Sequence, residues 1–108
     1  MKRARWHPLA VQDADDAAAW YAQHGGVTLE LSFIDALEST VGMLEQHPGA
    51  GSARHADLLA TPGLPLRFHP IRHFDDHLVY YIEHPAWIQV IRIWNARRGL
   101  DALVVDAL

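Results

Sequence analysis

The chain contains no cysteine among its 108 residues. It therefore has no disulfide, no thiolate nucleophile and no cysteine metal site, which fits a reducing cytoplasm better than secretion. No segment approaches the roughly 18 consecutive apolar residues that a membrane span needs. The basic N-terminal residues are followed by Trp6, His7 and Pro8, where a signal peptide would continue with an apolar stretch. We therefore expect a cytoplasmic protein without a membrane segment.

Positive charge is also scarce in the chain. Nine lysines and arginines stand against 13 aspartates and glutamates, and the formal net charge is -4. A protein that grips nucleic acid over its whole surface needs an excess of lysine and arginine, so this class is disfavoured and only a local basic patch remains. With 50% hydrophobic residues, residues 1–108 are expected to form one small domain with its own core.

Two helices are predicted in the first half of the chain, after a short strand over residues 3–8. The first helix begins at Leu9, carries apolar residues at spacings of three and four, and ends at the glycines 25–26. The second helix ends at residues 48–49. Its apolar stripe consists of Ile34, Leu37, Val41 and Leu44. A connecting loop is predicted over residues 50–65.

Three strands are predicted to follow, over residues 66–74, 77–84 and 87–94, with two-residue turns at 75–76 and 85–86. They would complete an α+β fold of the order β-α-α-β-β-β, with both helices on one face of an antiparallel sheet. In this register the helices would pack on Ile71, Leu78, Tyr80, Ile82, Ile91 and Ile93. The opposite face would carry Phe68, Arg72, His77, Val79, Tyr81, Glu83, Val90, Arg92 and Trp94.

The opposite face carries the candidate binding site. In the predicted register, two arginines lie on either side of Val79, roughly 10 Å apart, and two more follow the last strand. Tryptophan beside arginine is typical of interface hot spots. The predicted target-binding residues are Arg72, Arg92, Trp94, Asn95, Arg97 and Arg98. The alternative is an ordinary solvated face on which acidic residues such as Glu83 balance the arginines.

The order of the elements, together with five short motifs, resembles the RelE/ParE superfamily of toxins from type II toxin-antitoxin systems, and the ParE-like branch most. The motifs span residues 33–37, 44–48, 66–67, 77–81 and 90–98. The resemblance implies one of two activities, cleavage of messenger RNA on the ribosome or poisoning of DNA gyrase. In both branches a cognate antitoxin neutralises the toxin.

The two branches differ in the residues that the resemblance carries over. RelE-like ribonucleases have lysines at the positions of Phe68 and Pro70 and an arginine at the position of His77, and only Arg97 matches their pattern. RNA cleavage needs a base, an acid and cations around the phosphorane, and His77 titrates in the right range to be the base. ParE-like members often have His-Gly-x-Arg-Asp where this chain has Asn-Ala-Arg-Arg-Gly over residues 95–99.

The expectation is therefore a ParE-like toxin without cofactor that binds DNA gyrase and forms a hetero-oligomer with its antitoxin. It would be a poison without enzymatic activity of its own. The first alternative is a RelE-like mRNA endoribonuclease that acts on the ribosome with His77 and Arg97 as catalytic residues. The second is a non-toxic member of the family that only binds another protein.

Three smaller predictions concern single residue types. No metal site is predicted: His69 and His73 lie four residues apart on a predicted strand, roughly 13 Å along it, and cannot share one ion. The alternative is a site gathered from loop and turn histidines such as His47, His55 and His84. Trp20 is predicted to fill the core. The acidic residues Asp13, Asp15 and Asp16 are predicted to stabilise the first turn of the first helix through its dipole.

Overall fold

A computed structural model describes residues 1–56, 63–100 and 102–103. The elements are β1 (Arg3–Trp6), α1 (Pro8–Gln46), the short 3-10 helix η1 (Pro48–Ala50), β2 (Leu66–Ile71), β3 (Phe74–Glu83) and β4 (Trp87–Asn95). The strands form one sheet in the order β1-β4-β3-β2, in which β1 runs parallel to β4 and the other neighbours are antiparallel. The predicted α+β class is confirmed. Residues 57–62 of the predicted loop lie outside the described residues.

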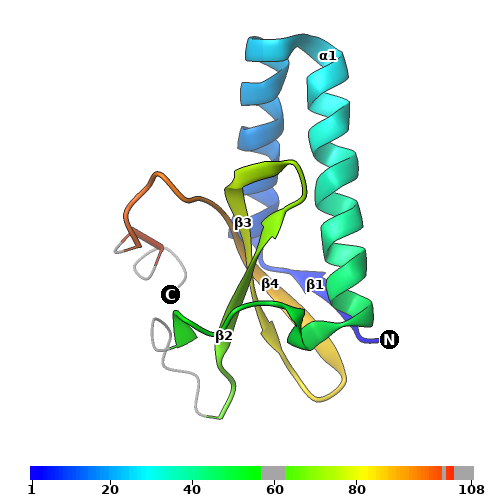
Figure 1. The fold of residues 1–108 in the computed structure, drawn as a ribbon, viewed down its shortest axis with the longest axis vertical. Coiled ribbons are helices and arrows are strands. Elements are labelled where there is room, and N and C mark those ends of the chain that lie inside the picture. The colour runs from blue at the N-terminus through cyan, green and yellow to red at the C-terminus, as the bar shows by residue number, and fades with distance from the viewer. Residues whose placement is uncertain (57–62, 101, 104–108) are drawn as a thin grey trace.

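One long helical element, α1, takes the place of the predicted pair of helices. It begins where expected, because Pro8 occupies the first turn and the Nδ1 atom of His7 accepts the backbone N–H of Leu9 at 3.0 Å. Its backbone leaves helical geometry at Gly26, where φ is 76°. The chain reverses there, so α1 has two arms that lie side by side and extend beyond the sheet (Figure 1).

Two neighbouring glycines of α1 resist a side chain: a Cβ at Gly25 would clash with Leu29, and Gly26 has a positive φ. At φ 76° an L-residue with a Cβ is strained, so Gly26→Ala should lower the free energy of unfolding by about 1 kcal/mol. Gly42 is the matched control, because it lies inside the second arm and a Cβ there would meet no atom within 4 Å. Gly42→Ala should raise stability by about 0.5–1 kcal/mol. Urea denaturation of both variants checks the opposite signs, and equal effects would contradict this role of Gly26.

The first hairpin of the sheet does not turn where the sequence predicts. Its turn consists of Arg72 and His73, with His73 at φ 68°, and residues 75–76 belong to β3. Ile71 therefore lies opposite Phe74, whose ring packs against Tyr21 and Phe33 of α1 at centroid distances of 5.0 and 5.3 Å. The turn lies three residues earlier than predicted. Because three is an odd number, the residues of β3 that share a face with Ile71 are Val79 and Tyr81 instead of the predicted Leu78 and Tyr80.

The second hairpin turns at Pro85 and Ala86 as predicted, and the backbone N–H of His84 donates to the carbonyl of Trp87 at 2.8 Å. Its predicted register holds up to the pair Tyr81 and Val90. A β-bulge follows, since Tyr80 lies opposite Arg92 and Ile91 is the extra residue in β4. The bulge changes the direction of every side chain from there to the end of the strand.

Together these shifts make most of the predicted face assignment wrong. The sheet residues buried against α1 are Ile71, Val79, Tyr81, Ile88, Val90 and Ile93. A second core lies on the other face, where Leu64, Leu100 and Leu103 cover side chains of the sheet. Its buried sheet residues are Leu66, Tyr80, Ile82, Ile91 and Trp94. Since both faces are apolar, alternation along the strands could not indicate which face packs on α1.

Candidate functional site

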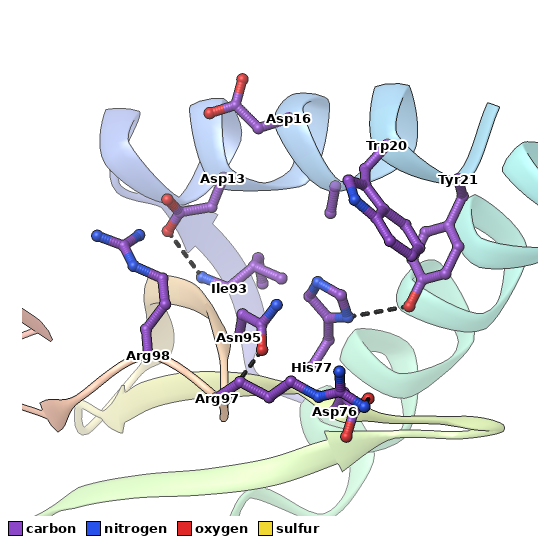
Figure 2. A pocket seen from close by; sticks show the side chains of 11 residues that line it. Asp13, Asp16, Trp20, Tyr21, Asp76, His77, Ile93, Asn95, Arg97 and Arg98 are labelled. Atoms are coloured by element: carbon purple, nitrogen blue, oxygen red, sulfur yellow. Dashed lines mark hydrogen bonds and ion pairs between the residues drawn. The ribbon is translucent and has the colours of Figure 1, made fainter. Parts of the chain in front are cut away.

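A recess of about 250 Å³ opens between the first arm of α1 and the place where β3 begins and β4 ends (Figure 2). The helix contributes an acidic and aromatic wall, and the strands contribute the floor and the opposite wall. The lining residues are Asp13, Asp16, Ala17, Trp20, Tyr21, Asp76, His77, Ile93, Asn95, Arg97 and Arg98.

His77 forms the floor of this recess and is 9% exposed. Its Nδ1 atom and the hydroxyl of Tyr21 share a hydrogen bond of 3.1 Å, and its ring also packs against Phe33. Burial lowers the pKa of the imidazole from its ordinary value of 6.5, and the negative charge of Asp76 opposes this shift only in part. His77 is therefore neutral at neutral pH.

The buried imidazole gives the fold a pH dependence of known sign. Because the pKa of His77 is lower in the folded state than in the unfolded state, the unfolded chain binds more protons as the pH falls below 6.5. We expect the free energy of unfolding to fall across that window, by at most about 1.4 kcal/mol per pH unit, and to level off below the folded pKa. Urea denaturation from pH 8 to 5 measures it. His77→Gln should remove the part of the slope that His77 contributes, because glutamine does not titrate. The part that the other histidines contribute should remain.

A tight turn directs two arginines outward at the end of β4. The Oδ1 atom of Asn95 accepts the backbone N–H of Arg97 at 2.9 Å, and its carbonyl accepts that of Arg98 at 3.0 Å. Asparagine favours such a turn because its side chain can accept a backbone N–H two residues on. Arg97, whose side chain is 79% exposed, pairs with Asp76 at 3.2 Å. An ion pair this exposed adds little stability, so Arg97 is available to a partner.

A buried ion pair ties the end of β4 to α1. The Nε and Nη2 atoms of Arg92 donate to Asp13 at 2.6 and 2.8 Å, and Asp13 also accepts the backbone N–H of Ile93 at 3.1 Å. The guanidinium groups of Arg92 and Arg98 both lie over the indole of Trp94, at 4.8 and 4.2 Å from the ring. The exposed Arg98 is thus connected to the helix through two buried side chains.

The structure divides the predicted binding residues into two groups. Asn95, Arg97 and Arg98 line the recess and reach solvent. Arg92 and Trp94 are buried, 4% and 0% exposed, so they support this end of β4 from inside instead of offering side chains to a partner. The expectation that Trp94 is an exposed interface residue is wrong, because it belongs to the second core.

Arg72 lies apart from these residues. It occupies the exposed turn between β2 and β3, where its backbone N–H donates to the hydroxyl of Thr40 at 3.4 Å. The predicted row of Arg72, Val79 and Arg92 does not form, since Val79 lies opposite His69 and Ile93. The shifted turn and the β-bulge together separate the two arginines.

Several residues that line the recess were not predicted as site residues from the sequence. Trp20 does not fill the core; it is 52% exposed and its indole stacks on His24 at 3.9 Å. The acidic residues were misassigned as well, because α1 begins at Pro8 and has no acidic residue in its first turn. The signal that could have revealed the wall is the helical spacing of Asp13, Asp16 and Trp20, which places them along one side of the first arm.

The described residues contain neither a cluster of metal ligands nor a membrane-spanning helix. None of their histidines, aspartates or glutamates form a group of three that could hold a metal ion. Within the same ranges, no helix combines the length and apolarity that crossing a membrane requires.

Comparison with known proteins gives a family match and a structural match. The family model for the ParE toxin of the type II toxin-antitoxin system parDE matches residues 4–100. The solved structure "Chromosomal ParDE TA system from P. aeruginosa" is similar with a TM-score of 0.70 and 22% sequence identity, over 88% of this chain and 96% of that chain. No curated protein matches the chain. At this identity the structural likeness supports the fold, whereas the family model covers most of the sequence.

Proposed function

Because the chain belongs to the ParE toxin family of type II toxin-antitoxin systems, we propose that it poisons DNA gyrase and is neutralised by a cognate antitoxin. The observation that supports gyrase binding is the pair of exposed arginines beyond β4, Arg97 and Arg98. They give a chain of net charge -4 a local positive patch. Such a patch attracts an acidic complex of enzyme and DNA although the whole protein is acidic.

Within this proposal the residues have different tasks. Asn95, Arg97 and Arg98 contact the target, and Arg92 with Trp94 holds Arg98 in place from the interior. Arg72 would form a second, separate contact from the β2–β3 turn. The toxin acts in the cytoplasm, where gyrase works, and its inactive form is a hetero-oligomer with the antitoxin.

A RelE-like ribonuclease is the second candidate, because His77 and Arg97 line the same recess. A neutral imidazole could take a proton from a 2′-hydroxyl. The phosphates of RNA would, however, meet Asp13, Asp16 and Asp76 in that recess. Gyrase binding needs only the exposed Arg97 and Arg98 and no phosphate beside His77, so the position of the carboxylates favours the gyrase proposal.

Pulse labelling after sudden induction in a bacterial host distinguishes these hypotheses. Gyrase poisoning should lower DNA synthesis within the first minutes while protein synthesis continues, and co-expression of the antitoxin, expected in a short neighbouring reading frame, should restore growth. An early fall in protein synthesis that His77→Ala abolishes would replace the proposal with the ribonuclease. Normal labelling and normal growth would leave only a non-toxic binding protein.

A further inference from the structure

The floor of the recess has a feature that the gyrase proposal does not explain, the Nε2 atom of His77. The Nε2 atom of His77 has no hydrogen-bond partner among the described residues, while Nδ1 is bonded to Tyr21. Figure 2 shows the imidazole between the rings of Trp20 and Tyr21 on one side and Asn95 on the other. The His77 side chain is nine-tenths buried, but this nitrogen is open to the recess, so a ligand that enters the recess can complete its hydrogen bonding in place of water.

The charges around the recess balance. Its three carboxylates, Asp13, Asp16 and Asp76, are matched by Arg97 and Arg98 on the opposite wall and by Arg92, which is paired with Asp13. An anionic or cationic ligand would gain from one wall and lose to the other. An uncharged group avoids this conflict and the cost of taking a charge out of water.

The lining residues and the volume of the recess restrict the choice of ligand further. Trp20 presents an exposed indole to the recess, and Ala17 and Ile93 add apolar surface, so a flat ring fits these walls. Small-molecule sites usually enclose about 300–1,000 Å³, whereas this recess of about 250 Å³ has room for one side chain. The site is therefore suited to a single aromatic anchor from a partner protein.

We propose that the recess receives a tyrosine side chain of a partner protein, whose ring packs on Trp20 and whose hydroxyl hydrogen-bonds to the Nε2 atom of His77. A phenolic hydroxyl both donates and accepts, so it fits either tautomer of His77. A phenylalanine would cover Nε2 without giving it a partner. A nucleotide is disfavoured as any other anion is, because its phosphate would gain from the arginines and lose to the carboxylates of Asp13, Asp16 and Asp76.

The test uses p-cresol, which is the side chain of tyrosine, and reads binding instead of toxicity, so it stands apart from the gyrase proposal. In NMR titrations of the whole chain, p-cresol should shift the resonances of the His77 imidazole and the Trp20 indole in a saturable way. Toluene differs from p-cresol only by the hydroxyl. It should bind about 2- to 12-fold more weakly, as one hydrogen bond predicts.

Two variants make the outcome decisive. His77→Phe keeps an aromatic floor and should make p-cresol and toluene bind equally well. Trp20→Ala changes a half-exposed residue that the fold tolerates and should weaken both compounds. The proposal is overturned if p-cresol causes no saturable shift at these two residues, or if acetate, methylguanidinium or uridine monophosphate binds the recess more tightly than p-cresol.

Discussion

Replacing Asp13 with alanine is expected to lower the free energy of unfolding by about 3–5 kcal/mol, the largest effect of any single substitution considered for this chain. The variant would leave the charge of Arg92 buried without the carboxylate that accepts two of its N–H groups. The backbone N–H of Ile93 would also lose its acceptor. Urea denaturation measures the change, and a fall in Tm of at least about 10 °C should accompany it.

Asp16 provides the matched control for this substitution. It lies one turn further along α1 and is exposed, and among the described residues only Gln12 donates a hydrogen bond to it. Asp16→Ala removes the same charge and should change stability by no more than about 0.5 kcal/mol. If Asp13→Ala were equally mild, Arg92 would not depend on Asp13.

A second variant tests the physical reason for the effect. Removing both ends of a buried ion pair and filling the space with an apolar side chain is often close to neutral, whereas removing one end is not. The double variant Asp13→Ala with Arg92→Met should therefore recover most of the stability lost in Asp13→Ala. Additive losses in the double variant would mean that the pair acts through packing and not through charge.

The ion pair also shows where prediction from sequence ends. The turn at Pro85 and Ala86 and the outward arginines at 97 and 98 were predictable, because each depends on residues close together in the chain. Asp13 and Arg92 are 79 residues apart, and no local pattern connects them. Their contact forms only once α1 packs across the sheet, so it is a property of the tertiary structure.

The prediction of which sheet residues face α1 failed for a related reason. Alternation identifies a buried face only where the other face is polar. In this chain Tyr80 and Ile82 pack under Leu100 and Leu103 on one side of the sheet, while neighbours along the strand pack under α1 on the other. The β-bulge at Ile91 then separates Arg92 from the row in which a regular ladder would place it. A one-residue irregularity thus changes which residues lie beside Arg92 on the sheet.

Replacing Arg97 and Arg98 together with alanine is expected to abolish the early fall in DNA synthesis that the gyrase proposal predicts. Each arginine at the centre of a protein interface can contribute about 2 kcal/mol or more, so the double variant should bind its target at least about 10³-fold more weakly. The fold should persist, because within the described part of the chain the Arg97 side chain makes an exposed ion pair alone and Arg98 is an exposed residue over Trp94. Pulse labelling at matched expression levels, with purified protein in a supercoiling assay, measures the loss.

The control for that experiment must change the net charge equally without touching the recess. Arg3 and Arg5 are exposed on the edge strand β1, and replacing both with alanine also removes two positive charges. If binding depends on the local patch, the Arg3 and Arg5 variant retains its effect on DNA synthesis and the Arg97 and Arg98 variant does not. If both variants lose activity alike, overall charge governs the encounter. Full activity of the Arg97 and Arg98 variant would instead move the target-binding surface away from the end of β4, and Arg72→Ala would then test the turn between β2 and β3.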